Sequence, residues 1–455
     1  MTDTTPRTPA RETPARETPA RETPATTDDG PGDPTGGRLG PYSALPRLAG
    51  AWFLPVAFAA RLPFTMLTIG TLLLVSGATG SVAAGSLAGA AAALGTAVGG
   101  PTQGALADRY GQRAVLLLCT PLATVALVAL VAVNLPGPPA STALTLTAAA
   151  LTGASAPQVG PLARVRWIGL TRGRPRTLSA ALSYESTADE VGFVLGPALV
   201  GVLATTASPA AAMLLAAGLL AVGGTAFALH PTARAVRAAT APREAAARES
   251  RGVPGMLALA RREAVPLAGM LCMGVLFGGT QTAATAFTTD VGQAGLGGVL
   301  YAVLGVGSAA TALAVVALPA RWGLGSRWTW FAAGLTASFA ALVLLVTTGS
   351  LGLVVAGIAV AGLFVGPVMV TVFTVASERA PVERTAAAMT LVASANVVGV
   401  ALGAALAGQA AGLGVAPAFV VPAVAAAGLL AVGVLLRSRP TGESRRPPVD
   451  AAHVV

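Results

Sequence analysis

Residues 385–436 have the sequence TAAAMTLVASANVVGVALGAALAGQAAGLGVAPAFVVPAVAAAGLLAVGVLL, which contains no Asp, Glu, Lys, Arg or His. Six further stretches share this property: 62–107, 114–163, 191–229, 264–289, 291–320 and 328–377. A helix that crosses a bilayer needs about 20 mostly apolar residues. Four of the seven stretches, with 46, 50, 50 and 52 residues, are long enough for two crossings each, and those with 26 and 30 residues hold one each. The remaining stretch, 191–229, supplies two more crossings when it is extended back to Leu178. The sequence therefore predicts an all-α membrane protein with 12 transmembrane helices.

The distribution of arginine predicts the orientation of these helices, because short cytoplasmic loops collect positive charge. The chain has no Lys, so Arg carries the whole signal. If the N-terminus is cytoplasmic, the tails and the loops on that side hold 28 of the 29 arginines, and only Arg61 falls inside a span. A water-soluble protein with a large apolar core does not explain this alternation. We therefore expect a multi-pass protein of the plasma (inner) membrane with both termini cytoplasmic.

The composition limits the classes of function. Charged residues make up 11% of the chain and hydrophobic residues 54%, and 55 glycines suit helices that pack closely in lipid. The net charge of +10 is spread over seven segments, so we expect no nucleic-acid partner. The spans lack histidine, a metal-ligand cluster and a nucleotide-binding glycine loop, so we expect neither an enzyme nor a metal or cofactor site. The expected partners are the bilayer, protons and a small-molecule substrate, with the chain as a monomer.

The chain divides into five regions by composition. Residues 1–46 contain TPARE three times in succession and are Pro-rich and polar, which predicts a disordered cytoplasmic tail. Residues 47–229 and 264–437 hold six spans each. Between them lies an Arg- and Ala-rich cytoplasmic linker, 230–263, and residues 438–455 form a C-terminal cytoplasmic tail.

Internal repetition supports the division into two six-helix halves. Three features recur in order at offsets of 206 to 208 residues: Val159–Pro161 as Val365–Pro367, Arg176-Thr177 as Arg384-Thr385, and the pair Gly192 and Gly196 as Gly399 and Gly403. Spans 4 and 5 therefore look like distant copies of spans 10 and 11. Two parallel six-span repeats are a common transporter plan, with the substrate site between them near the middle of the membrane.

The sharpest local motif is GALADRYGQR at residues 104–113, between spans 2 and 3 on the predicted cytoplasmic side. It resembles the loop signature of the major facilitator superfamily, G-x-L-x-D-R-x-G-R-[RK], except that Gln112 stands where that family has a basic residue. The resemblance covers about residues 50–437 and implies a transporter that works by alternating access. It also implies that this loop latches the two halves together in the outward-facing state, with Asp108 and Arg113 as gating residues.

The chemistry of the loop agrees with that role. Gly104 and Gly111 permit a tight turn and a close backbone approach, and Asp108 can accept hydrogen bonds from amides at a neighbouring helix N-terminus. Arg109 and Arg113 could instead be simple cytoplasmic anchors, which would explain their charges but not the acid between the two glycines. These five residues form the candidate gating motif.

Span 5 carries three acids where a charge near the helix centre costs about 2.5–3.5 kcal/mol on insertion scales. Glu185 and Asp189 share one helical stripe, and Glu190 points about 100° away from Asp189. We take Arg61 as the only basic residue within a span, so one cation faces three carboxylates. At least one acid should then exchange a proton, which makes these four residues the candidate proton-coupling site. The alternative is that Glu185 is solvated near the interface and that Arg61 and Asp189 form a purely structural pair.

The same span continues with Gly192, Gly196, Pro197 and Gly201. This pattern is similar to the motif G-x-x-x-G-P-x-x-G-G of facilitator drug/proton antiporters, although its last glycine lies one place late. The resemblance favours efflux over uptake. Close helix packing at the glycines and a bend at the proline account for the pattern equally well.

The resemblance also places spans 1, 4, 7 and 10 around the substrate pathway, and with them Gln158 and Gln281. Both side chains could equally be interhelical hydrogen-bonding groups. Because the acids outnumber Arg61, we expect a neutral or cationic lipophilic substrate rather than an anion. The predicted function is secondary active export of such a compound in exchange for protons, driven by the proton gradient. The alternatives are an importer or proton symporter on the same fold and, in another class, a non-transporting membrane receptor or scaffold.

Overall fold

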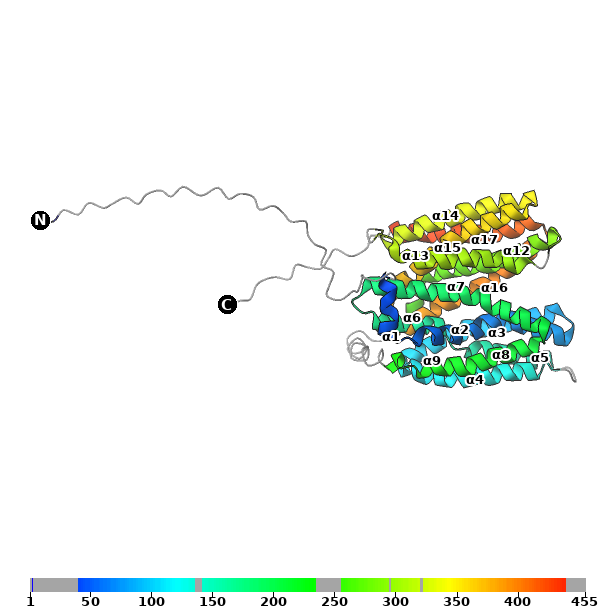
Figure 1. Ribbon diagram of the computed structural model, residues 1–455, viewed down its shortest axis with the longest axis horizontal. Helices are drawn as coiled ribbons and strands as arrows, with labels where there is room; N and C mark the ends of the chain where they lie inside the picture. Colours follow the sequence, from blue (N-terminus) through cyan, green and yellow to red (C-terminus); the bar gives the residue numbers. More distant parts are fainter. Residues whose placement is uncertain are drawn as a thin grey trace.

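The computed structural model describes Thr2 and residues 40–135, 141–234, 255–293, 296–319 and 322–438. These residues form helices joined by short turns, and no strand occurs among them. Ten helical elements are long and apolar enough to cross a membrane. The other two crossings are α3, which is rich in Gly and Ala, and a pair of shorter helices, α5 and α6, that follow one another in the chain. The chain is therefore an all-α membrane protein with 12 spans, as predicted (Figure 1).

Each half of the bundle contains six spans. The first half consists of α2 (Phe53–Thr79), α3 (Val82–Tyr110), α4 (Gln112–Ala132), α5 (Thr142–Ser155) with α6 (Val159–Leu170), α7 (Pro175–Thr206), and α8 (Pro209–Leu219) continued by the π-helical turn η2 (Leu220–Gly224) and α9 (Thr225–Leu229). The second half consists of α12 (Ala264–Asp290), α13 (Gly297–Ala314), α14 (Leu324–Leu345), α15 (Leu351–Arg379), α16 (Thr385–Ala411) and α17 (Val415–Ser438). The halves are stacked one above the other in Figure 1.

Glycines permit close helix contacts at corresponding places in the two halves. In the first half α7 packs on α2, and a Cβ at Gly196 would collide with the side chain of Thr65. In the second half α16 packs on α12, and a Cβ at Gly403 would collide with the backbone carbonyl of Val275. Spans 5 and 11 thus occupy equivalent positions against spans 1 and 7, and the absence of a side chain permits each contact.

The two halves meet through α3 with α16 and through α7 with α13. We call the end of the bundle at which α1 lies, at the left of Figure 1, the terminal end. Tyr42 donates a hydrogen bond across the halves to the carbonyl of Leu313 at 2.6 Å, and Thr187 donates one to the carbonyl of Ala309 at 3.2 Å. Both bonds lie in the part of the bundle nearer the terminal end, where they hold the halves together.

Span 4 is broken between α5 and α6 at Ala156, Pro157 and Gln158. Pro157 has no amide hydrogen, so the carbonyl groups of the preceding turn lose helical partners. Gln103 of α3 replaces them, donating from Nε2 to the carbonyls of Ala154 at 2.9 Å and Ala156 at 3.0 Å. The break turns the N-terminus of α6 toward the centre of the bundle, where broken helices of transporters form binding sites.

The boundaries expected for the tails and linker fall largely outside the described residues, including 3–39, 235–254 and 439–455. At the N-terminal boundary, helical structure begins at Gly40, earlier than the tail limit of residue 46, as the turn η1 (Gly40–Ser43) followed by α1 (Ala44–Ala49) with a buried Leu45. In the linker, the short helix α11 (Met256–Arg262) buries Leu259 against α16.

Candidate functional site

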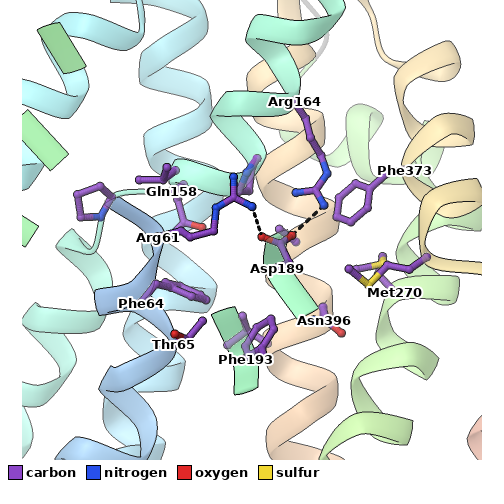
Figure 2. A pocket seen from close by; sticks show the side chains of 17 residues that line it. Arg61, Phe64, Thr65, Gln158, Arg164, Asp189, Phe193, Met270, Phe373 and Asn396 are labelled. Carbon is purple, nitrogen blue, oxygen red and sulfur yellow. Dashed lines mark hydrogen bonds and ion pairs between the residues drawn. The ribbon is translucent and has the colours of Figure 1, made fainter. Parts of the chain in front are cut away.

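A cavity lies between the two halves near the middle of the bundle and has about 670 Å³ of empty space, its mouth included. Its first-half lining is Arg61, Phe64, Thr65, Pro157, Gln158, Val159, Gly160, Pro161, Arg164, Asp189 and Phe193, and its second-half lining is Met270, Met369, Phe373, Ala393, Asn396 and Val397. The wall is mostly apolar, with a few polar side chains that converge around Asp189 (Figure 2).

Asp189 is held between two guanidinium groups. Its Oδ1 accepts a hydrogen bond from Nη1 of Arg61 at 2.9 Å, and its Oδ2 accepts one from Nη2 of Arg164 at 2.8 Å. The three residues come from α7, α2 and α6, and the dashed lines in Figure 2 mark the two pairs. Both guanidiniums are almost fully buried, whereas the side chain of Asp189 is 19% exposed. Asp189 is therefore a carboxylate that the cavity reaches.

Arg61 also pairs with Glu185, one turn before Asp189 on α7. Oε1 of Glu185 accepts a further hydrogen bond from the indole nitrogen of Trp167 at 2.8 Å, and the residue has no exposed surface. The shared stripe of Glu185 and Asp189 is thus confirmed, since both face Arg61 on α2. The alternative that Glu185 is solvated near the interface is wrong.

Arg61 is not the only cation inside the bundle, which corrects the sequence analysis. Arg164 and Arg166, assigned there to a cytoplasmic loop, lie on α6 with exposures of 1% and 0%. The guanidinium carbon of Arg164 lies 3.8 Å from the ring centroid of Phe373 on α15, so this cation also touches the second half. The expectation of a neutral or cationic substrate relied on a single cation facing three acids, and that support is lost.

Arg166 explains the departure of the loop motif at Gln112. Its Nε donates to Oε1 of Gln112 at 2.9 Å, and its Nη1 donates to the carbonyl of Phe227 at 3.0 Å and to the hydroxyl of Thr232 at 3.1 Å. A basic side chain at position 112 would place a second positive charge against this buried guanidinium. A neutral amide accepts a hydrogen bond from it instead.

Glu190 turns away from the cavity and toward the second half. It is 5% exposed and lies beside Ser308 and Tyr301 of α13. Its Oε1 has no hydrogen-bond partner among the residues that the structure describes. Glu190 and Asp189 thus point in different directions, as predicted. Glu190 lies at the contact between the halves, and Asp189 lies at the cavity wall.

The remaining predicted pathway and packing residues divide between the cavity and the helix contacts. Gln158 lines the cavity and donates from Nε2 to the carbonyl of Ala156 at 3.1 Å, whereas Gln281 of α12 is not among the lining residues. Gly192, like Gly196, faces Thr65 of α2. Two further residues of the antiporter-like pattern, Pro197 and Gly201, lie within α7, and a Cβ at Gly201 would meet open space.

The loop motif joins the two halves at the terminal end. Oδ1 and Oδ2 of Asp108 accept hydrogen bonds from the amides of Ala386 and Ala387, each at 2.8 Å, at the N-terminus of α16. Gly104 packs against the same turn, where a Cβ would collide with Thr390. These contacts are of the kind that the sequence predicts for an acid at a helix N-terminus.

The other members of the loop motif have local roles. Gly111 has φ +88° and joins α3 to α4, so it makes the tight turn expected of a glycine. The guanidinium carbon of Arg109 lies 5.2 Å from the ring centroid of Tyr110, and no hydrogen bond or ion pair joins Arg113 to another described residue. The gating function of the motif stays a prediction.

Glu263, between α11 and α12 at the terminal end, is a buried acid that makes the free energy of unfolding depend on pH. It has no exposed surface, and neither carboxylate oxygen has a hydrogen-bond partner in the described ranges. Burial raises the pKa of Glu263 to about 7, against the opposing influence of Arg379 and Arg262. The folded protein therefore holds the proton of Glu263 more tightly than the unfolded chain does. The stability that protonated Glu263 contributes is present at low pH and is lost as the pH rises through about 7.

We therefore expect Glu263→Gln to change the pH dependence of stability. The variant should match the wild type in thermal unfolding at pH 5 and be more stable at pH 8. Unfolding of the detergent-solubilised protein, followed by circular dichroism across this range, measures the difference. Asp290→Asn, at the exposed opposite end of α12, is the matched control. An equal shift at both pH values would contradict the prediction.

Sequence reasoning missed Arg164, Phe373 and Asn396. A signal for Arg164 existed, because Gly160, Arg164 and Trp167 fall on one helical face, and the first two line the cavity while the third binds Glu185. Asn396 is the only Asn in the charge-free stretch 385–436, and an isolated amide in a span is a candidate polar contact. Phe373 carries no sequence signal, since it is one apolar residue among many.

Comparisons with known proteins agree with this architecture. A family model described as Major Facilitator Superfamily matches residues 53–404 and also residues 281–454. No curated protein matches the chain. The fold is similar to the crystal structure of the human organic anion transporter MFSD10 (TETRAN), with 20% identity, a TM-score of 0.63, and coverage of 86% of this chain and 99% of that one. It is also similar to a bacterial homologue of the iron transporter ferroportin in an outward-facing state with soaked iron, with 15% identity, a TM-score of 0.65 and the same coverage.

Proposed function

Because the chain belongs to the major facilitator superfamily, we propose that it is a proton-coupled secondary transporter of a lipophilic small molecule and that Asp189 is the carboxylate that exchanges the proton. It is a transporter rather than an enzyme. The observation that supports the coupling role is the position of Asp189 between two buried guanidiniums at the wall of a cavity shared by both halves. Acids placed in this way inside a membrane bundle are commonly proton-relay sites.

Asp189 is a better candidate for the exchanging group than its two acidic neighbours. Among the lining residues it is the one carboxylate, so protons and substrate can reach it from the same space. Glu185 is enclosed by Arg61 and Trp167 and serves to hold Arg61 in place. Glu190 lies at the contact with α13, where its own protonation would change the packing of the two halves against each other.

Alternating access requires the contacts at the terminal end to break and re-form. Asp108 of α3, bound to the amides at the start of α16, and the hydrogen bonds of Tyr42 and Thr187 join the halves at this end. From the distribution of arginine we propose that the terminal end faces the cytoplasm and that the membrane is the plasma membrane. Separation of the halves there would free the carboxylate of Asp108 from the two amides and open the cavity inward.

Two directions of transport are compatible with proton exchange at Asp189. Export in exchange for protons is favoured by the likeness of residues 192–201 to the antiporter pattern, although Gly192 and Gly196 also serve the packing of α7 on α2. Uptake together with protons is the second candidate. The observation in its favour is that two guanidiniums and one carboxylate line the cavity, an arrangement that does not repel an anion.

Substrate-driven proton movement in inverted membrane vesicles tests the proposal. Vesicles are energised to an acid interior, and a pH-sensitive dye follows the lumen while compounds from a toxicity and nutrient panel are added. Export by exchange predicts that an active compound makes the lumen less acidic, whereas uptake with protons predicts further acidification. Asp189→Asn should reduce either response to that of vesicles without the protein, and Asp290→Asn should leave it unchanged.

The outcomes of this experiment are distinct. Retention of substrate-driven proton movement by Asp189→Asn would overturn the coupling role. Flux of a compound without any proton movement would overturn proton coupling but keep transport. Absence of flux for every compound in the panel would favour the receptor or scaffold alternative.

A further inference from the structure

Arg164 has more hydrogen-bonding capacity than its protein partners use. A guanidinium carries five N–H donors, and the structure gives Arg164 a single hydrogen bond, from Nη2 to Asp189. Its Nε is buried and has no partner among the described residues, and its Nη1 faces Gly160. A buried cation with unfilled donors at a cavity wall is well placed to bind an oxygen ligand.

The N-terminus of α6 faces the same place. Val159 and Gly160 begin this helix of 12 residues and line the cavity. Val159 donates its amide to the carbonyl of Pro157 at 2.9 Å, and Pro161 has no amide hydrogen, whereas the structure gives the Gly160 amide no partner within the described segments. A free amide at the positive end of a helix favours a negatively charged group.

Asn396 supplies a third unused group from the opposite half. It lies on α16, lines the cavity and is 8% exposed, and neither Oδ1 nor the donor Nδ2 of its carboxamide has a hydrogen-bond partner in the part of the chain that the structure describes. Figure 2 shows Asn396 on the far side of the cavity from Gln158, near Asp189. A buried carboxamide without partners costs free energy unless something binds it, so it is a second and independent indication of a ligand.

We propose that Arg164, the Gly160 amide and Nδ2 of Asn396 donate hydrogen bonds to the carboxylate of an amphipathic organic acid, which is the substrate. The inference rests on the proposed function and specifies its substrate class. The apolar wall formed by Phe64, Phe193, Met270, Met369 and Phe373 would contain the hydrocarbon part. Because these groups come from both halves, the bound anion would bridge them.

This assignment fixes the relation between substrate and proton. The charged groups around Asp189 are Arg61 on α2, Arg164 on α6, and Glu185 and Glu190 on α7, while α12, α15 and α16 present no titratable side chain to the cavity among its lining residues. An anion on the remaining donors of Arg164 shares this guanidinium with Asp189 and places a second negative charge beside its carboxylate, which favours a proton on Asp189. Proton and anion therefore bind together, which favours uptake with protons over exchange.

A matched set of three probes tests the proposal by binding alone. These are 4-phenylbutyrate, 4-phenylbutanamide and 4-phenylbutylamine, which share the hydrocarbon part and differ in charge. Thermal unfolding of the purified full-length protein in detergent is measured with each probe at millimolar concentration and at pH 6 and 8. We expect only 4-phenylbutyrate to raise the unfolding temperature, and to do so more at pH 6 than at pH 8.

Variants connect that response to the named groups. Asn396→Leu should weaken the stabilisation by 4-phenylbutyrate, and Arg164→Gln should remove it. Gln281→Leu, which replaces an amide outside the cavity lining, should leave it unchanged. If Arg164→Gln does not fold, Asn396→Leu still decides the matter.

Several results would overturn the proposal: no stabilisation by 4-phenylbutyrate, equal stabilisation by all three probes, stabilisation by the amine alone, or an unchanged response in Asn396→Leu. None of these measurements uses a proton gradient or transport. Failure of the binding prediction is therefore distinguishable from failure of proton coupling at Asp189.

Discussion

Replacing Arg61 with methionine is expected to lower the free energy of unfolding by about 3–5 kcal/mol, the cost of leaving a buried charge without its partner. Arg61 pairs with both Glu185 and Asp189, and its exposed fraction is 3%. Asp189 keeps Arg164 after the substitution, but Glu185 keeps only the indole of Trp167. The unpaired carboxylate of Glu185 is therefore the main source of the loss.

A second substitution isolates that cause. Glu185→Gln in the Arg61→Met background removes the unpaired charge while preserving the oxygen that accepts from Trp167. We expect the double variant to recover much of the lost stability, measured by SDS-induced unfolding in mixed micelles and circular dichroism. Arg47→Met, at an exposed position on α1, is the control and should change stability by less than about 0.5 kcal/mol. Equal stability of the single and double variants would show that the ion pair is not the source.

The second large effect is expected at the helix contact of the second half. Gly403→Ala should lower the free energy of unfolding by about 1–3 kcal/mol, because the added methyl group meets the backbone of Val275, which cannot move aside without shifting α12. Gly408→Ala is the matched control on the same helix. There, the nearest atom to an added Cβ is the methyl group of Thr282 at 3.9 Å, an ordinary contact distance.

The same unfolding measurement compares the two alanine variants. Loss of stability in Gly403→Ala alone would confirm that α16 and α12 are in backbone contact. Equal stability of both variants would contradict the contact and would weaken the equivalence of spans 5 and 11. An increase in Gly408→Ala is compatible with the prediction, since alanine is the better helix former.

The fold could be predicted because lipid imposes two simple requirements: long stretches without charge and arginine on one side. The same reasoning extended to the stripe of Glu185 and Asp189, because helical periodicity fixes which residues share a face. It extended to Asp108 as well, since an acid between glycines in a short loop has few ways to be satisfied.

The burial of Arg164 and Arg166 in span 4 could not be predicted by the same reasoning. An arginine near the end of a charge-free stretch has the same sequence signature whether it extends to water or turns inward. The inward direction of Arg164 depends on Asp189, and that of Arg166 depends on Gln112 and Phe227, all distant in sequence. Assigning every arginine between two spans to a solvated loop placed Arg164 and Arg166 in water. The predicted number of positive charges inside the bundle was therefore too low.

The hydrogen bond between Arg166 and Gln112 also shows that the loop motif has a spatial equivalent of its absent basic residue. Position 112 is neutral, and Nε of Arg166 on α6 lies 2.9 Å from its side-chain oxygen, so a positive charge is present beside this position. Restoring arginine at 112 would therefore require a compensating exchange at 166. A sequence search that requires a basic residue at position 112 would miss related proteins with this arrangement. A search that accepts a basic residue at position 112 or at position 166 would find them.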